Sequence, residues 1–223
     1  MQLNLPNNPR SRMMWIIAGV ILVLAGVMIL GLSGVFGPSV ESLASSADPA
    51  DRQAAVERLS ERGTESSARL LSALAADRDP ETARLAVRGL GQVQTQANLD
   101  ALTRILDNNK LSKNARAEAG FTIGKFKAAD PKVLTERLSV EREPDPVVRA
   151  GVAKGLARME MPSTIPQLSA ALEDPNPEVR RWAISAIHRM VIRTFPYDAD
   201  KPPQDQQAVI QKIREYLRKV KVL

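Results

Sequence analysis

Arginine is the residue in this sequence whose spacing points most clearly to a chemical role. Arg52, Arg84, Arg116, Arg149 and Arg180 follow one another at intervals of 32, 32, 33 and 31 residues. A guanidinium presents a planar fork of N–H donors that matches carboxylate and carbonyl oxygens. Such a series either ties successive structural units together or binds an anionic ligand. We interpret Arg52, Arg116, Arg149 and Arg180 as structural, because they lie in segments otherwise built from small apolar residues.

A second row of charged side chains predicts a surface for a partner. In each repeat, the residues two before and two after a central apolar residue are four apart, and residues four apart share one face of a helix. The row begins with the acidic pair Glu57 and Glu61 and becomes basic further along the chain. Its candidate partner-binding cations are Arg84, Arg88, Lys125, Lys154, Arg158, Arg181 and Arg189. A basic groove of this kind suits an acidic protein surface or anionic lipid headgroups, and the alternative is an ordinary solvated face.

Side chains suited to catalysis are scarce. His188 is the only histidine among 223 residues and there is no cysteine, so neither a multi-histidine metal centre nor a thiolate site can form. "GLGQVQ" (89–94) lacks the third glycine of a dinucleotide loop. We therefore expect no enzyme activity, no cofactor and no metal. A net charge of +6 with 4% aromatic residues also argues against a nucleic-acid partner.

The N-terminal part of the sequence predicts a membrane-spanning helix over residues 13–37. No charged residue occurs between Met13 and Val40, and about 20 apolar residues suffice to cross the hydrocarbon core. The alternative is a cleaved secretory signal, whose apolar region is normally shorter. Arg10 and Arg12 precede the segment, so the positive-inside rule predicts a cytoplasmic N terminus and an extracytoplasmic, periplasmic remainder of a bacterial single-pass protein.

Small residues recur every seven positions within this apolar segment, at Gly19, Gly26 and Ser33. Small side chains allow a second helix in the bilayer to approach closely. We interpret these three residues as candidates for packing against a partner helix, the alternative being the general abundance of glycine in membrane helices.

The elements that must position the charged rows are paired helices. Leu70, Leu102, Leu134 and Leu168 repeat at 32, 32 and 34 residues, each with a second leucine four positions later. This predicts one amphipathic helix per unit, capped at Thr64, Thr95 and Thr164. A second helix opens at Asp-Pro or Asn-Pro, where the side chain caps and proline fits the first turn; its caps are Asp48, Asp79, Ser112, Asp145 and Asn176. Because one such pair cannot bury its apolar face, the units must stack.

The pattern resembles the HEAT-like repeat family, in particular the short repeats of the phycobilin-lyase type. "DPVVRAGVAKGL" (145–156) and "NPEVRRWAISAI" (176–187) carry the resemblance, and "DPETARLAVRGL" (79–90) shows it more loosely. It implies a right-handed superhelix whose concave face is lined by the second helices. Two departures stand out: Arg84 falls one residue late, with Ala83 in the equivalent place, and the third unit lacks the Asp-Pro.

Together these patterns predict an all-α fold, with one N-terminal transmembrane helix followed by an α-α superhelical solenoid of about four to five two-helix repeats. The predicted divisions are a tail (1–12), the transmembrane helix (13–37), a linker (38–47), the solenoid (48–193), an irregular insert (194–203) and a capping helix (204–223). In the insert, "FPY" (195–197) is either an exposed contact anchor or a plug for the end of the solenoid. Trp182 is interpreted as a core residue.

The function expected from this architecture is that of a membrane-anchored interaction scaffold. Such a protein would bind a membrane-associated protein partner through the concave face, as an accessory or assembly subunit of a larger membrane complex. Membrane lipid would contact residues 13–37. The alternative is a lyase-like or chaperone-like HEAT protein that handles a prosthetic group or chromophore.

Overall fold

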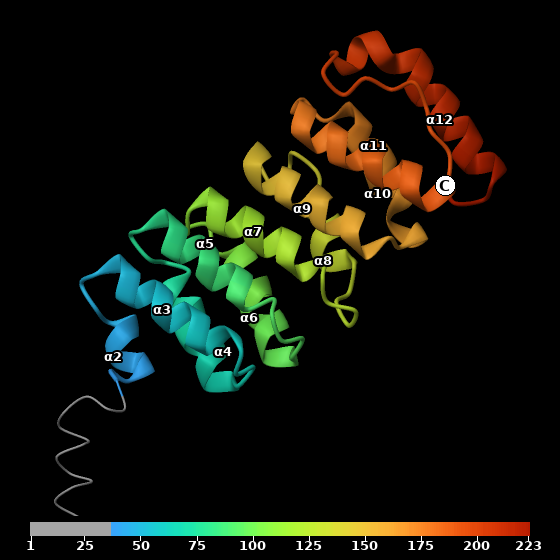
Figure 1. Ribbon diagram of the computed structural model, residues 1–223. Coiled ribbons are helices and arrows are strands. Elements are labelled where there is room, and N and C mark those ends of the chain that lie inside the picture. Colours follow the sequence, from blue (N-terminus) through green and yellow to red (C-terminus); the bar gives the residue numbers. More distant parts are fainter. Residues whose placement is uncertain (1–36) are drawn as a thin grey trace, which may run out of the picture. The chain divides into compact units, whose positions relative to one another are not determined.

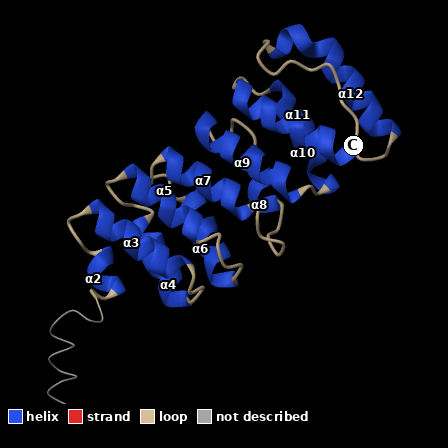
Figure 2. Ribbon diagram, in the orientation of Figure 1, coloured by secondary structure: helices blue, strands red, loops and turns tan. Residues whose placement is uncertain are grey.

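The structure is a computed structural model and describes residues 37–223. It divides into two units, residues 1–43 and 44–223, of which the second is the helical domain considered below. Within the described residues every regular element is an α-helix or a 3-10 turn, and Figure 2 shows no strand among them. This agrees with the absence of alternating apolar patterns in the sequence.

The helical domain consists of two layers of stacked helices. The second helix of each repeat contacts the next second helix, so that they lie side by side in chain order (Figure 1). These second helices are α3 (Pro49–Ser60), α5 (Pro80–Gly89), α7 (Lys113–Ile123), α9 (Pro146–Met159) and α11 (Pro177–Val191). The first helices form the other layer: α4 (Glu65–Leu74), α6 (Gln96–Asp107), α8 (Lys132–Thr135) and α10 (Ile165–Ala170). The predicted all-helical solenoid of paired helices is therefore confirmed.

The remaining elements flank or interrupt this stack. A short helix, α2 (Val40–Ala44), precedes it, and α12 (Gln207–Lys219) follows it after an irregular segment. Three 3-10 turns complete the structure: η1 (Pro162–Thr164), η2 (Ala171–Glu173) and η3 (Pro203–Gln206). In α12 the side chains of Ile210, Ile213 and Leu217 are buried, while its other positions are mostly charged or polar, as expected of a terminal helix in a repeat protein.

Side-chain caps determine where the second helices begin. Asp48, Asp79, Ser112, Asp145 and Asn176 all accept hydrogen bonds from backbone N–H groups of the first turn. Among the first helices, Thr64 and Thr95 cap as predicted. Thr164 does not: it ends the turn η1, and its buried hydroxyl donates to the Met161 carbonyl at 2.7 Å.

The leucine pairs of the first helices supply much of the core. Leu102, Leu134 and Leu168 are fully buried, but Leu70 is only half-buried and Leu71 takes the interior position in its repeat. The first helices of the later repeats are short, since α8 has four residues and α10 has six, compared with ten in α4 and twelve in α6. The buried leucines of these repeats are thus held by turns as well as by helix, and α7, α9 and α11 form the more regular layer.

Helices α7 and α9 approach one another closely enough for their backbones to touch. A Cβ atom added at Gly155 would overlap the carbonyl oxygen of Gly120, and one added at Gly124 would overlap the backbone of Gly155. Gly151 lies in the same way against Ala117 of α7. Glycine at these positions permits the close approach, as its lack of a Cβ allows. We call this contact the glycine seam.

One part of the predicted fold class and the predicted localisation require correction. Among residues 37–223, no helix is long and apolar enough to cross a membrane. The segment 13–36, with its proposed packing residues Gly19, Gly26 and Ser33, lies outside the described residues. The single N-terminal transmembrane helix and the single-pass, periplasmic localisation are therefore not supported, and the architecture is stated as a helical solenoid.

Candidate partner-binding site

Arg52 and Arg149 of the regular arginine series are buried and paired with a carboxylate of the following repeat. The Nε and one terminal nitrogen of Arg52 donate to Asp77 at 2.6 and 2.8 Å. Arg149 binds Asp174 in the same bidentate way at 2.8 and 3.0 Å, and both residues of that pair have side chains only 2% exposed. The third nitrogen of each arginine donates to two carbonyl oxygens of the loop before its own helix. Hydrogen bonds from Arg52 hold the pKa of Asp77 below its usual value.

The other two structural arginines vary this arrangement. Arg116 donates to the Leu106 carbonyl at 3.0 Å and forms a buried ion pair with Glu143. Arg180 has no carboxylate acceptor among the residues that the structure describes. It donates to backbone carbonyls instead, including Ala199 at 2.6 and 3.0 Å. The last arginine of the series therefore fastens the irregular insert to the solenoid.

Arg84 lies outside this buried series, consistent with its one-residue offset in the sequence. It forms an ion pair with Glu81 at 2.5 Å on the surface of α5, and its side chain is 35% exposed. The equivalent position is filled by Ala83, which is buried. The inter-repeat arginine contacts are thus interrupted at the second repeat.

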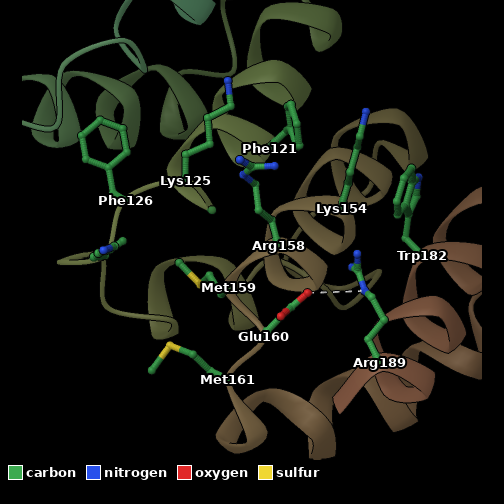
Figure 3. Close-up of a pocket in the computed structure, with 13 residues that line it drawn as sticks. Phe121, Lys125, Phe126, Lys154, Arg158, Met159, Glu160, Met161, Trp182 and Arg189 are labelled. Atoms are coloured by element: carbon green, nitrogen blue, oxygen red, sulfur yellow. Dashed lines mark ion pairs between the residues drawn. The ribbon is translucent and has the colours of Figure 1, made fainter. Parts of the chain in front are cut away.

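Four of the predicted partner-binding cations come together around one hollow on the layer of second helices. Lys125, Lys154, Arg158 and Arg189 line a hollow of about 780 Å³ between α7, α9 and α11 (Figure 3). Its wall carries five cationic side chains, the fifth being Lys127, against one carboxylate, Glu160. The remaining lining residues are aromatic, small or sulfur-containing: Phe121, Gly124, Phe126, Ala129, Met159, Met161 and Trp182. A volume of this size falls within the range of binding pockets.

The hollow has two chemically different ends. In the view of Figure 3, Lys125, Lys154 and Arg158 extend toward one side together with aromatic rings, and we call this the cationic end. Met159 and Met161 lie on the opposite side, the methionine end, where the Met161 residue is 38% exposed. A ligand filling the hollow would meet positive charge at one end and polarizable apolar atoms at the other.

Aromatic rings hold the lysines of the cationic end in place. The ammonium of Lys154 lies 4.3 Å from the centre of the Phe121 ring and 5.2 Å from that of Trp182. The ammonium of Lys125, four residues after Phe121 in the sequence, lies 5.2 Å from the centre of the same Phe121 ring. Such contacts attract the cation through the ring quadrupole without using its N–H donors. The donors of both lysines stay available for an anionic ligand.

The cationic end is also poorly neutralised. Within the described part of the chain, Lys125, Lys154 and Arg158 form none of the ion pairs found at 4.0 Å or less. Burial lowers the pKa of Lys125, and the charges of Arg158, Arg88 and Lys154 lower it further, although Glu118 opposes them. Like charges held together in this way favour the binding of an anion.

The other predicted cations are paired with carboxylates. Arg88 lies outside the hollow and its Nε is 3.1 Å from Glu118. Arg181 pairs with Glu178 and, at 2.5 Å, with Asp200. Arg189 lines the hollow but donates to the Ala157 carbonyl at 2.6 Å, with Glu160 at 3.7 Å. The predicted basic row therefore contains one cluster without ion pairs among the described residues, formed by Lys125, Lys154 and Arg158. The other cations of the row are paired with carboxylates.

The acidic beginning of the row lines a hollow of its own. Glu57 of α3 and Glu61, which caps its C-terminal end, line a depression of about 310 Å³ together with Arg88 and Gln92 of the next repeat. Glu57, Glu61 and Arg88 belong to the predicted row, whose charge changes from negative to positive along the chain. The positive cluster at α7, α9 and α11 is thus the distinctive part of the row.

Several residues of the site were missed or misread in the sequence, among them Trp182, Met159 and Met161. Trp182 is half-buried in the wall of the hollow rather than in the core. Its position seven residues, or two helical turns, before Arg189, a member of the row, would have placed it on the same helix face. Met159 and Met161 had no such signal, because they lie where α9 ends and the chain turns away.

The insert "FPY" folds back onto the end of the solenoid. Phe195 packs against His188 and Tyr216, with ring centres 5.8 and 5.5 Å apart, and its N–H donates to His188 Nε2 at 3.0 Å. The Tyr197 hydroxyl donates to the Leu172 carbonyl at 2.5 Å. Burial lowers the pKa of His188, which suits its role as a neutral acceptor. The sequence left open whether "FPY" is an exposed contact anchor or a plug for the end of the solenoid, and these contacts correspond to the plug.

Metal-binding geometry is absent from the part of the chain that the structure describes. No group of three or more His, Asp or Glu side chains there is arranged to hold an ion. The hollow itself offers one carboxylate among five cations, a donor set that repels metal ions.

A solved structure and a family model are similar to this chain. A crystal structure of an engineered protein is similar with 18% identity and a TM-score of 0.44, over 80% of this chain and 87% of that one. No curated protein matches. The narrower resemblance to the phycobilin-lyase type stays a prediction. The family model for HEAT repeats, however, matches residues 38–120, 109–187 and 131–219, and so the chain belongs to the HEAT-repeat family.

Proposed function

We propose that this protein is an interaction scaffold that binds a protein partner at the hollow between α7, α9 and α11. HEAT repeats generally mediate protein–protein interactions, and the family membership supports that general role. The observation that carries the specific site is the convergence of Lys125, Lys154 and Arg158, none of them ion-paired within the described residues, on one hollow.

The remainder of the second-helix layer offers weaker alternatives. Arg84, Arg88 and Arg181 already have carboxylate partners, so a ligand would have to displace an internal ion pair there. Exposed ion pairs contribute little stability and are screened by salt, but they do cancel local charge. The partner is therefore expected to make its strongest electrostatic contacts at the hollow.

Site-specific crosslinking of the full-length protein in its own cells tests this proposal. A photo-crosslinking amino acid placed at Met161 should capture a defined partner, whereas the same amino acid at Arg104, which lies outside the hollow, should not. Combining the Met161 probe with Arg158→Glu should abolish the product. Capture that is equal from both positions, or unaffected by Arg158→Glu, would remove the hollow as the binding site.

A further inference from the structure

The chemistry of the hollow also indicates what part of a partner it receives. We propose that the hollow binds an extended acidic segment of the partner protein, with carboxylates at its cationic end and a neighbouring apolar side chain at its methionine end. This inference rests on the proposed function and specifies its ligand.

The concave shape favours an extended segment over a folded surface. An open hollow of about 780 Å³, bordered by α7, α9 and α11 and their connecting loops, has room for several side chains of a peptide. A convex protein surface can place only a few side chains in such a hollow, whereas the ammonium groups over Phe121 and Trp182 come from two different segments of its wall. A peptide can reach them, because its side chains extend alternately to both sides.

Charge and preorganisation favour carboxylates at the cationic end. Lys154 is held between two rings and Lys125 over one of them, so binding costs little additional side-chain entropy. Lys125, Lys154 and Arg158 form no ion pair within the described residues, and burial together with the neighbouring cations lowers the pKa of Lys125. A carboxylate at this point would relieve the repulsion among the cations.

The methionine end favours an apolar neighbour to the acidic residues. Met159 is half-buried and Met161 is exposed, and thioether side chains adapt to irregular apolar groups. A purely acidic segment would leave this end in contact with water. A segment that combines acidic and apolar side chains occupies both the cationic end and the methionine end of the hollow.

A nucleic-acid strand fits the same surface less well. Binding along a phosphate backbone needs unpaired cations over many phosphates. Here the cations beside the hollow, Arg88 and Arg181, are paired with carboxylates, so the positive track ends at the hollow. The positive charge is concentrated at the cationic end of the hollow, where it suits a few carboxylates.

A tryptophan in the wall of the hollow makes the test direct. The chain has two tryptophans, and Trp15→Phe leaves Trp182 as the single reporter in the full-length protein. The probe is the labelled peptide acetyl-DEFDELDE-amide, compared with acetyl-NQFNQLNQ-amide, in which every acid is replaced by its amide, and with acetyl-DEGDEGDE-amide, which lacks the apolar residues. We expect the first peptide to change Trp182 emission and to bind at least tenfold more tightly than either control, as measured by fluorescence anisotropy.

Matched charge reversals assign the binding to the hollow. Lys154→Glu with Arg158→Glu should weaken binding at least tenfold. The milder pair Lys154→Gln with Arg158→Gln should also weaken binding, and it replaces the first pair as the test if the charge reversal disturbs folding. Lys110→Glu with Lys132→Glu, two exposed cations that do not line the hollow, should change it less than twofold.

Three results would overturn the inference. They are equal binding of the acidic and amide peptides, equal loss in the hollow and control variants, and equal binding of a single-stranded oligonucleotide of the same charge. Failure of the peptides while crosslinking at Met161 still depends on Arg158 would overturn only the extended segment, leaving a folded partner surface at the hollow. Loss of that crosslinking dependence would instead overturn the proposed function.

Discussion

At the scale of single residues, the stability of the domain depends on arginines that are removed from water. Arg149 and Asp174 satisfy each other inside the protein, and the remaining guanidinium donors bind backbone carbonyls. A buried pair of this kind adds little over two apolar residues, but removal of one partner leaves an uncompensated charge. The arginine series is therefore a set of positions where a single change is costly.

Replacement of Arg149 by methionine should strongly destabilise the protein. The Asp174 carboxylate, 2% exposed, would lose its cationic partner, and we expect the free energy of unfolding to fall by about 3–5 kcal/mol. Urea unfolding followed by circular dichroism measures this. Arg84→Met is the matched control, since its exposed pair with Glu81 should change stability by less than about 1 kcal/mol. Equal losses in the two variants would contradict the structural role.

Protonation of His188 should loosen the insert at acid pH. Its Nε2 accepts the Phe195 N–H, and its pKa in the folded state is lowered by burial. The folded state thus binds fewer protons than the unfolded state below about pH 6.5, so stability is greatest above that pH and falls as the pH drops toward the lowered pKa. His188→Gln, which keeps an acceptor but does not titrate, should remove this part of the pH dependence in denaturation curves at pH 5 to 8. Identical pH profiles for both proteins would refute it.

At the scale of elements, the glycine seam positions the two helices that carry the cationic end. Lys125 lies two residues after the end of α7, and Lys154 and Arg158 lie on α9. Backbone contact between these helices brings the three side chains to one hollow. Gly151 and Gly155 therefore matter to the site without lining the hollow, whereas Gly124 both belongs to the seam and lines it. A wider spacing would separate the charges.

Alanine at Gly155 should disturb this contact more than alanine at Gly89. The new Cβ would overlap the backbone carbonyl of Gly120, which cannot move independently of α7, and we expect a loss of about 1–3 kcal/mol despite alanine's better helix propensity. At Gly89 the new atom would meet the Ser60 hydroxyl, which can rotate away. Thermal or urea unfolding measures the loss of stability in the two variants. A greater loss at Gly89 would contradict the argument.

Some helix boundaries could be predicted from the sequence and others could not, because only some of them depend on local residues. Helix caps such as Asp145 and Asn176 depend on neighbouring residues, so local patterns were sufficient. The shortness of α8 and α10 depends on how each segment packs against α9 and α11, which local periodicity does not contain. Trp182 was misread for a related reason: its exposure depends on the neighbouring repeat.

At the scale of the whole molecule, the domain is a row of units that contact mainly their neighbours. Consecutive second helices touch, from α3 to α11, and each regular arginine reaches into the next repeat or its loop. Stability in such an array is a sum of unit and interface contributions. A local change is thus expected to have a local effect.

Hydrogen exchange should show that a destabilising substitution affects mainly the repeats close to it. In the full-length Arg149→Met protein, faster exchange should be concentrated in α9, α10 and α11, close to the lost pair, while α3 and α4 keep most of their protection. Exchange measured by mass spectrometry on peptides from both regions provides the comparison, with Arg84→Met as the reference. A uniform increase over residues 44–223 would indicate a single cooperative unit instead.

The glycine seam also bears on how the site discriminates among ligands. Two helices whose backbones touch cannot slide past each other without a clash, so the charges they carry keep their separation when other junctions flex. A flexible surface could adjust itself to almost any arrangement of carboxylates, but this one holds a fixed pattern. Among segments with equal numbers of acidic residues, selectivity then depends on the intervals between those residues rather than on their total charge.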